Sequence, residues 1–496
     1  MLNYLIFSPL VAAFVILLLK RGGIKIFSVL ASFIILVLNI KVFFDFLSGT
    51  DFEYKVSFEI LKLFNYHIGV DSIALILMLL CSLMVFLSFV FLKLEQKDIV
   101  LNIFLLEFAM LGLFSALDAL LFYVFWEFSL LPLIYIMGIY SKEFKYGIKF
   151  FIYAFIGSIL MLVAMIYLAY LNYQLLNIWT FDLEIWKNNV SGANLNEQLI
   201  LFAAFFIAFA IKSPLFPFHT WAPKVYAKSP TIVSVMLVSF KMAPFGFLKF
   251  CLVLFPDASV YYMPLIAALC IVSIIYCALI AYRSDDLKEL IAYSSLSHIG
   301  VIILGIFSFN TLGISGSVFY MFAHGLVTGV LFLMAQSLFQ RYNTYEISFY
   351  HSLANKAPLF AIFFAIVLLS SISLPLTLSF IGEFLVLLGI AKINLLYAFL
   401  AGLVIILGAI YMLNLFRKMF FMQKDNDIMG FRLYFREVFV LGIATILIFY
   451  LGIAPKIFLE PLQENSKELI NTMSIKAIEQ STIEFLSNLK GENYAK

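Results

Sequence analysis

Six titratable side chains lie inside long apolar runs of this sequence. They are Glu127, Lys212, Lys241, His298, His324 and Glu383. A charged residue at the centre of a membrane span costs roughly 2.5–3.5 kcal/mol even on the mildest scale, so it is a functional candidate by default. Burial raises the pKa of a carboxyl group and lowers that of a lysine, whereas a partner of opposite charge reverses both shifts. Carboxyl, amine and imidazole groups in this order therefore suit a proton relay near the middle of a membrane.

The first carboxylate, in LFYVFWEFSLLPLIYIMG, would pair with the first lysine if the fold brings the two together. Glu127 would then keep Lys212 charged. If the carboxylate moves away or is protonated, the lysine can release its proton. Lys241, the histidines and Glu383 could receive that proton through hydroxyl groups and water.

Further polar residues near this set are secondary candidates. Glu107 is also mid-span, but it could equally be a buried, hydrogen-bonded carboxyl group. A lone buried histidine is more often a satisfied core residue, yet His298 follows the hydroxyls of Ser294 and Ser297 in AYSSLSHIG. Lys249 lies near a helix end, where a lysine can reach the membrane surface, which favours a structural role. The secondary candidates are Glu107, Pro214, Pro375, Ser294 and Ser297.

Two of the charged residues lie where a helix cannot run through. In FAIKSPLFPFHTWAPK, Lys212 precedes Pro214 and two further prolines. In SISLPLTLSFIGEFLVLLG, Pro375 and Gly382 flank a hydroxyl-rich stretch that ends at Glu383. Proline removes a backbone donor and clashes with the preceding turn. Irregular backbone at membrane depth is tolerated only where it lines a cavity or is buried in protein, so two broken helices point to a transport path.

The composition requires a membrane as solvent. The 496 residues are 64% hydrophobic and 12% charged, against roughly 45–50% and about 25% in soluble domains. At about 20 residues per span, the sequence predicts an all-α polytopic protein with about fourteen transmembrane helices. The predicted spans are 3–19, 26–47, 70–92, 99–116, 119–140, 149–172, 199–227 (interrupted), 231–255, 261–282, 287–307, 311–338, 358–390 (interrupted), 394–416 and 434–453.

Lysine and arginine concentrate in alternate loops, which predicts that both termini lie outside. The first apolar run lacks a basic segment before it, so we expect an uncleaved span rather than a signal peptide.

The spacing of the charged candidates predicts an internal repeat. Glu127 and His298 are 171 residues apart, as are Lys212 and Glu383. This interval spans an odd number of helices, so the second copy of the repeat would be inverted in the membrane. The expected units are 1–98, a first five-helix repeat at 99–255, a second at 261–416, a last helix at 434–453, and a polar tail at 454–496. The tail reads as an amphipathic helix or a loosely docked segment.

The chain holds no recognisable redox chemistry of its own. Its four cysteines lie in apolar segments without a CxxC pair, so no disulfide, thiolate metal site or iron–sulfur cluster is expected. Neither a dinucleotide fingerprint nor a phosphate-binding loop is present. The energy for proton transfer would therefore come from a partner or an ion gradient.

The motifs FYVFWEFSLLP, FAIKSPLFPFHTWAP, SFKMAPFGFLKF, DLKELIAYSSLSHIG, FAHGL and LPLTLSFIGEF occur in this order. Over about residues 70–420 the sequence resembles the antiporter-like membrane subunits of respiratory complex I and of Mrp-type Na⁺/H⁺ antiporters. The resemblance implies fourteen helices with two inverted five-helix repeats. It also implies that Glu127, Lys212 and Lys241 are the family's charged residues of spans five, seven and eight, followed by His298 and His324.

Within this family, Glu at the span-twelve position, here Glu383, favours one complex I paralogue over the others and over the Mrp subunits, which have Lys. The resemblance implies proton translocation as part of a quinone oxidoreductase in a bacterial-type inner membrane. It places NADH or another donor, FMN, iron–sulfur clusters and quinone in partner subunits, with other antiporter-like subunits as neighbours. An Mrp-type antiporter subunit and a membrane anchor of a hydrogenase or formate-oxidising complex remain alternatives.

The sequence departs from the family at two places. Lys224, Tyr226 and Lys228 stand where relatives usually have Asp, His and Glu, and we expect altered surface charge or subunit contacts there. Leu376 and Ser379 replace glycines after the span-twelve proline, which predicts a less open break.

Overall fold

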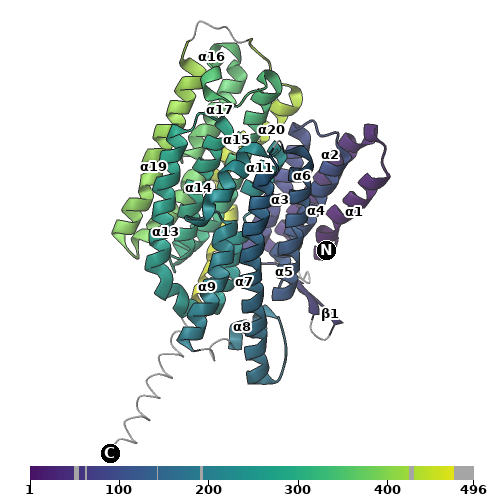
Figure 1. Cartoon of the computed structure of the whole chain (residues 1–496), viewed down its shortest axis with the longest axis vertical. Coiled ribbons are helices and arrows are strands. Elements are labelled where there is room, and N and C mark those ends of the chain that lie inside the picture. Colours follow the sequence, from purple (N-terminus) through teal and green to yellow (C-terminus); the bar gives the residue numbers. More distant parts are fainter. Residues whose placement is uncertain (50–54, 62–63, 142, 190–193, 424–428, 474–496) are drawn as a thin grey trace, which may run out of the picture.

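Long, nearly parallel helices form a single bundle in the computed structural model (Figure 1). The structure describes residues 1–49, 55–61, 64–141, 143–189, 194–423 and 429–473. Within these residues, twelve helical segments are long and apolar enough to cross a membrane. Shorter apolar helices at Leu2–Leu18, Pro358–Ser371 and Leu378–Ala391 supply the first predicted span and the two halves of the interrupted span 358–390. The prediction of an all-helical membrane protein with about fourteen spans is therefore confirmed.

The amino-terminal region contains a small hairpin that was not predicted. Two antiparallel strands pair between the second and third helices, and they reach away from the bundle at the end opposite α16 (Figure 1). Apolar and polar residues alternate in KVSFEIL, as expected for a strand with two unlike faces. The elements are α1 (Leu2–Leu18), α2 (Arg21–Leu47), β1 (Lys55–Leu61), β2 (Phe64–Gly69) and α3 (Ser72–Phe91).

The next region carries the first three charged candidates. Its helices are α4 (Lys97–Ser115), α5 (Ala119–Phe128), α6 (Leu130–Tyr140), α7 (Lys145–Leu176), α8 (Leu183–Asn189), α9 (Leu195–Lys212), α10 (Ala222–Lys228), α11 (Thr231–Ser239) and α12 (Met242–Gly246). A 3-10 turn at Phe218–Trp221 leads into α10, and a π-helical segment at Phe247–Leu252 continues α12.

The carboxy-terminal half carries both histidines and Glu383. Its helices are α13 (Pro256–Arg283), α14 (Leu287–Ile306), α15 (Thr311–Tyr342), α16 (Leu353–Lys356), α17 (Pro358–Ser371), α18 (Leu378–Ala391), α19 (Leu395–Phe416) and α20 (Phe435–Ile453). A 3-10 turn at Ile347–Phe349 and a π-helical end at Arg417–Phe421 complete this half. Residues 456–473 are helical, and Leu462 and Ser466 are fully buried. This part of the tail is therefore docked, and the remainder lies outside the described residues.

Both predicted helix breaks are present. Helix α9 ends at Lys212, just before Pro214, and the indole of Trp221 donates to the carbonyl oxygen of Ile211 at 2.9 Å. Helices α17 and α18 are separated by a segment in which Ser373 and Leu376 adopt positive φ angles of 57° and 73°. Leu376 therefore holds the left-handed conformation that favours glycine, the residue expected there from the family resemblance.

A third break was missed. Helix α11 stops at Ser239 and α12 starts at Met242, which leaves Phe240 and Lys241 outside both helices. Pro244 explains the break, because it cannot donate to the carbonyl of Phe240 four residues earlier and its ring clashes there. A smaller interruption at Ser129 separates α5 from α6, three residues before Pro132. Glu127, Lys212 and Lys241 thus lie at or next to an interruption of their helices, and Glu383 lies in the second turn after one.

Two β-bridges repeat one structural pattern in the two halves. Asp118 caps the start of α5 and pairs with Asp182, which follows α7. Asp286 caps the start of α14 and pairs with Glu346, which follows α15. Helices α7 and α15 are both 32 residues long and both end in a left-handed asparagine. The same closure of a helix start by a distant loop therefore occurs twice.

Candidate functional site

Lys241 is the central group of the site. It is 3% exposed, and the break between α11 and α12 places its ammonium group beside two acceptors. The nitrogen donates to the freed carbonyl oxygen of Val238 and lies 2.9 Å from Nδ1 of His324. The interrupted backbone thus supplies one partner for the lysine, and α15 supplies the other.

From His324 a chain of polar groups continues toward α18. The rings of His324 and His298 are 6.0 Å apart between centroids. The hydroxyl of Tyr320 lies 2.7 Å from Nδ1 of His298, and that nitrogen is 3.9 Å from Oε1 of Glu383. Ser373 donates a hydrogen bond to the other carboxyl oxygen. A buried series of titratable groups therefore joins Lys241 to Glu383 through two helices.

Close packing of α15 on α18 brings Glu383 to this series. A Cβ atom built on Gly382 would lie 2.7–2.9 Å from the backbone and Cβ of Tyr320, which real structures do not allow. Gly382 is thus required where the two helices touch. On the other side, a Cβ on Gly452 of α20 would lie 2.2 Å from the carbonyl oxygen of Leu376. Two glycines therefore hold the broken span tightly between its neighbours.

Glu127 and Lys212 form a separate part of the site. Oε1 of Glu127 and the ammonium nitrogen of Lys212 are buried and have no hydrogen-bond partner within the described residues. No ion pair joins them there, although Glu127 acts on the lysine electrostatically. The ammonium group instead lies 5.0 Å from the ring centre of Phe150 and 5.5 Å from that of Trp126. The predicted partners are thus neighbours held apart, with aromatic faces stabilising the cation.

An apolar cavity lies between Lys212 and the break at Lys241. Its volume is about 20 Å³. It is lined by Lys212, Leu106, Leu133, Trp221, Tyr226, Met236, Leu237, Phe240 and Met242. A second cavity, of about 10 Å³, is lined by the histidines and by Ser294, Tyr320, Thr328, Ser371 and Ser379, among others. A water molecule needs about 10–15 Å³, so each space has room for about one.

The secondary candidates have different surroundings. Ser294 contacts the hydroxyl of Tyr411 at 2.8 Å and lines the cavity next to His298. Ser297 donates to the carbonyl oxygen of Ile274 at 2.8 Å, which ties α14 to α13. Glu107 is fully buried on α4, and within the described chain neither carboxyl oxygen has a hydrogen-bond partner. Pro214 and Pro375 lie in the two predicted breaks.

Sequence reasoning missed two groups that contact the site directly. Tyr320 lies four residues before His324 on α15, so the helical repeat alone could have placed its hydroxyl on the same face. Ser373 lies in the quoted motif, but its contact with Glu383 depends on a positive φ angle that no local signal predicted.

Charged groups at the ends of the bundle are held apart from the site. Lys249 pairs with Asp71, the cap of α3, at 3.2 Å, so its side chain reaches the helix end as expected. Near the hairpin, His67 contacts Asp182 at 2.6 Å. Burial raises the pKa of Asp118 to about 6, and the Asp182 carboxylate adds to the shift.

The first group of departures from the family, at Lys224, Tyr226 and Lys228, lies at the opposite end of the bundle. Lys224 pairs with Glu289 of α14 at 2.8 Å. Tyr226 is fully buried, and its carbonyl oxygen accepts from Ser234 at 2.7 Å. The buried Lys288 donates to the carbonyl oxygen of Ser229 at 2.8 Å. The contacts of Lys224 and Lys288 join α10 and the residue that follows it to α14, and the contact of Tyr226 joins α10 to α11.

All four cysteines are buried and unpaired. In the part of the chain that the structure describes, no three His, Cys, Asp or Glu side chains gather as metal ligands.

A broken-helix bundle with buried lysines, histidines and carboxylates defines an antiporter-like membrane subunit. The family model described as "NADH:quinone oxidoreductase/Mrp antiporter, TM" matches residues 116–410, and the chain belongs to this family. Within the family, the chain is an NADH-quinone oxidoreductase subunit M homologue.

Relatives cover almost the whole length. NADH-quinone oxidoreductase subunit M of Rickettsia prowazekii is 37% identical over 94% of this chain and 97% of its own. NADH-ubiquinone oxidoreductase chain 4 of Chondrus crispus is also 37% identical, with the same coverage. A chain of respiratory complex I from Thermus thermophilus superposes with a TM-score of 0.88 at 30% identity, over 95% of this chain and all of the other. The chain is therefore a membrane subunit of the proton-translocating oxidoreductase class.

Proposed function

We propose that this complex I subunit moves protons along Glu127, Lys212, Lys241, His324, His298 and Glu383, with Tyr320 as a further member. The observation that carries the proposal is the buried contact series from Lys241 to Glu383. Its titratable members are buried, and Lys241 lies at a helix break, which membrane interiors tolerate only where the backbone lines a cavity or is buried in protein.

The carboxy-terminal part of the path can pass a proton by short steps. The Lys241 ammonium donates to Nδ1 of His324 when that nitrogen is unprotonated. The proton then leaves from Nε2 of His324 through the small cavity toward His298. The hydroxyl of Tyr320 contacts Nδ1 of His298 and lies beside Glu383. When Nδ1 carries a proton, the hydroxyl can accept it and pass its own proton to the carboxylate.

The amino-terminal part of the path would regulate when Lys212 releases its proton. Glu127 and Lys212 are close but unpaired, so a small movement of α5 at Ser129 would change how strongly the carboxylate stabilises the ammonium. A proton that leaves Lys212 must cross the apolar cavity beside Phe240 to reach Lys241. Water entry into that cavity is the step at which we place the gate.

The two β-bridge closures support the proposed repeat units 99–255 and 261–416. If α5 and α7 correspond to α14 and α15, Asp118 corresponds to Asp286 at opposite ends of the bundle. That arrangement is what an inverted repeat requires. The remaining proposed units are 1–98, 434–453 and 454–496.

We place both termini outside an energy-conserving inner membrane, by the positive-inside rule. Other antiporter-like subunits would be the neighbours in the membrane arm. NADH or another donor, FMN, iron–sulfur clusters and quinone would act in partner subunits, and redox energy would reach this chain through subunit contacts.

The test is paired substitution in the whole assembly. Glu127→Gln and Lys212→Ala are introduced, and quinone-reductase turnover and dye-detected proton uptake are measured in inverted membrane vesicles. Both variants should lose most proton uptake while the assembly persists on native gels. Lys249→Ala is the matched control, because this lysine is paired at the helix end. Near-normal proton uptake in either test variant would refute the path.

A further inference from the structure

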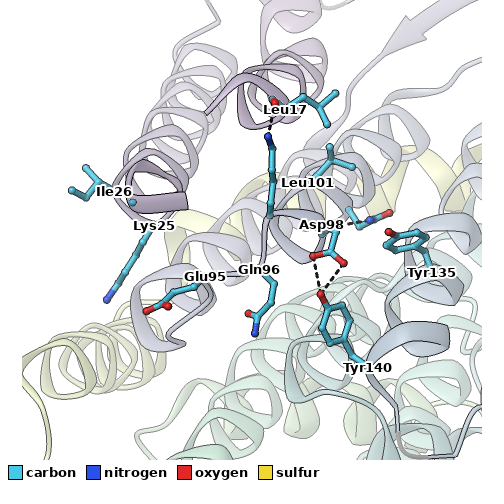
Figure 2. Close-up of a pocket in the computed structure, with 12 residues that line it drawn as sticks. Leu17, Lys25, Ile26, Glu95, Gln96, Asp98, Leu101, Tyr135 and Tyr140 are labelled. Atoms are coloured by element: carbon cyan, nitrogen blue, oxygen red, sulfur yellow. Dashed lines mark hydrogen bonds between the residues drawn. The ribbon is translucent and has the colours of Figure 1, made fainter. Parts of the chain in front are cut away.

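A large cavity outside the proposed path opens near the loops that join α1 to α2 and α3 to α4. Its volume is about 1150 Å³, and it is bounded by the end of α1, the start of α2, the loop before α4, the start of α4 and the second half of α6. In the proposed topology this is the inner side of the membrane. Figure 2 shows Lys25 and Ile26 at one side, Glu95 and Gln96 below, and Asp98 with the two tyrosines at the other side.

The charged groups of this cavity balance each other. Its lining contains two lysines, Lys25 and Lys97, and two carboxylates, Glu95 and Asp98. Lys97 donates to the carbonyl oxygens of Leu17 and Leu19, which fixes its ammonium group at the end of α1. A purely anionic ligand would therefore face two carboxylates, whereas a ligand with one charge of each sign finds a partner for both.

The hydrogen bonds hold the acidic side of the cavity in place. Both carboxyl oxygens of Asp98 accept from the hydroxyl of Tyr140 at 2.8 Å (Figure 2). Asn102, which is 8% exposed, donates to the carbonyl oxygen of Asp98 at 2.8 Å. This end of α4 is thus a fixed surface.

The rim of the cavity is apolar and continuous with two exposed helix faces. Leu17, Ile26 and Tyr135 line the cavity and are 52%, 67% and 46% exposed. Beyond them, Phe14 and Leu18 of α1 and Leu131 and Ile139 of α6 are also exposed. Hydrocarbon chains would cover these faces, and tyrosine is typical of the level where chains meet headgroups.

We propose that the cavity binds one zwitterionic glycerophospholipid with a primary-amine headgroup. The phosphate lies beside Lys25 and Lys97, the ammonium lies beside Glu95 and Asp98, and the acyl chains follow the exposed faces of α1 and α6. A primary ammonium donates hydrogen bonds to carboxylates, which a quaternary ammonium cannot do. The volume exceeds that of common small-molecule pockets and accommodates a headgroup with its glycerol.

The experiment uses the purified assembly in nanodiscs that contain a trace of phosphatidylethanolamine with a photoreactive acyl chain. After illumination, the labelled peptides are identified and the label is competed with unlabelled lipids. We expect label on α1 and α6. Phosphatidylethanolamine should compete about tenfold better than phosphatidylcholine or phosphatidylglycerol, the difference expected for one charge-assisted hydrogen bond. Equal competition by all three lipids would show an unspecific lipid layer and overturn the proposal.

Two variants and two controls locate the site. Lys25→Ala and Glu95→Gln should each lower labelling of α1 and α6 by about tenfold. Lys41→Ala, at the far end of the same helix α2, and Glu143→Gln, which is paired with Lys145, should not change it. If cross-linking instead joins the cavity to a neighbouring subunit, a protein occupies it and the proposal is wrong. If a variant fails to assemble, the lipid competition on the unmodified chain still tests whether the cavity prefers a primary-amine headgroup.

Discussion

The ammonium nitrogen of Lys241 lies 2.9 Å from Nδ1 of His324, at the point where the helix carrying the lysine is interrupted. The same nitrogen also donates to the carbonyl oxygen of Val238, a group that the interruption frees. A lysine in a regular helix would not find this acceptor. The break and the histidine together give the buried ammonium group two hydrogen-bond acceptors. It can donate to the carbonyl oxygen of Val238 and to Nδ1 of His324.

Substitutions at Lys241 should separate charge from shape. Lys241→Ala removes the donor to His324 and should lower proton uptake by roughly a hundredfold, the range for one positioned proton-transfer group. Lys241→Arg keeps a cation that can donate hydrogen bonds, so it should retain part of the activity. The remaining loss is expected because arginine does not release its proton. Proton uptake and quinone-reductase turnover in vesicles measure both. Equal activity of the two variants would contradict a charge role.

Tyr320→Phe tests the group that sequence reasoning missed. The change removes a hydroxyl that lies 2.7 Å from Nδ1 of His298, while the backbone and Cβ atom that pack on Gly382 remain. A buried group that loses its hydrogen-bond partner costs about 1–3 kcal/mol, so proton uptake should fall roughly 5- to 100-fold. Assembly on native gels should be unchanged.

The matched control for this variant is Tyr411→Phe. The hydroxyl of Tyr411 contacts Ser294 at 2.8 Å, and Tyr411 is as buried as Tyr320. Its hydrogen-bond partner in the described chain is thus this serine and not a histidine of the series. Its effect on proton uptake should be smaller. If Tyr411→Phe is the more damaging of the two, the exit runs past Ser294 instead of through Tyr320.

The sequence alone was enough for the spans, the two proline breaks at Lys212 and Glu383, and the identity of the buried charges. Each of these follows from local composition, because an apolar run of set length or a proline imposes its effect on the nearby chain. The third break follows the same rule through Pro244, three residues after Lys241, so it too could have been predicted from the sequence.

Contacts between distant segments could not be predicted in this way. The expected Glu127–Lys212 ion pair is absent in the described chain, and the ammonium group lies instead beside the rings of Trp126 and Phe150. The hairpin at β1 and β2 and the contact of Ser373 with Glu383 also depend on backbone geometry far from any strong local signal. Such features are decided by packing, which a single sequence does not display.

Lys249→Ala should have a mild effect. The lysine pairs with Asp71 at 3.2 Å at the end of α3, where both side chains are partly exposed. Pairs of this kind contribute about 0–1 kcal/mol, so assembly and proton uptake should stay close to normal. Thermal unfolding of the purified assembly and vesicle assays measure the two quantities. An inactive but assembled variant would instead place Lys249 on the proton path.

Asp118→Asn should remove a pH dependence of stability. Burial raises the pKa of Asp118 to about 6, from an ordinary value of 3.8. The folded chain therefore binds the proton more tightly than the unfolded chain does. Stability is highest below about pH 4 and falls as the pH rises to about 6, by at most roughly 2–3 kcal/mol.

Asparagine keeps an oxygen that can accept from the N–H of Leu121, as Asp118 does at 2.9 Å, but it carries no charge. The variant should thus be the more stable protein at pH 7, and its unfolding temperature should vary less between pH 4 and 6. A thiol-reactive dye measures unfolding directly, because all four cysteines are buried and free. Glu184→Gln is the control. Contact with Lys55 lowers the pKa of the Glu184 carboxyl, so this group makes stability rise with pH, which is opposite to the effect of Asp118. An unchanged slope in Asp118→Asn would show that Asp118 does not cause the pH dependence.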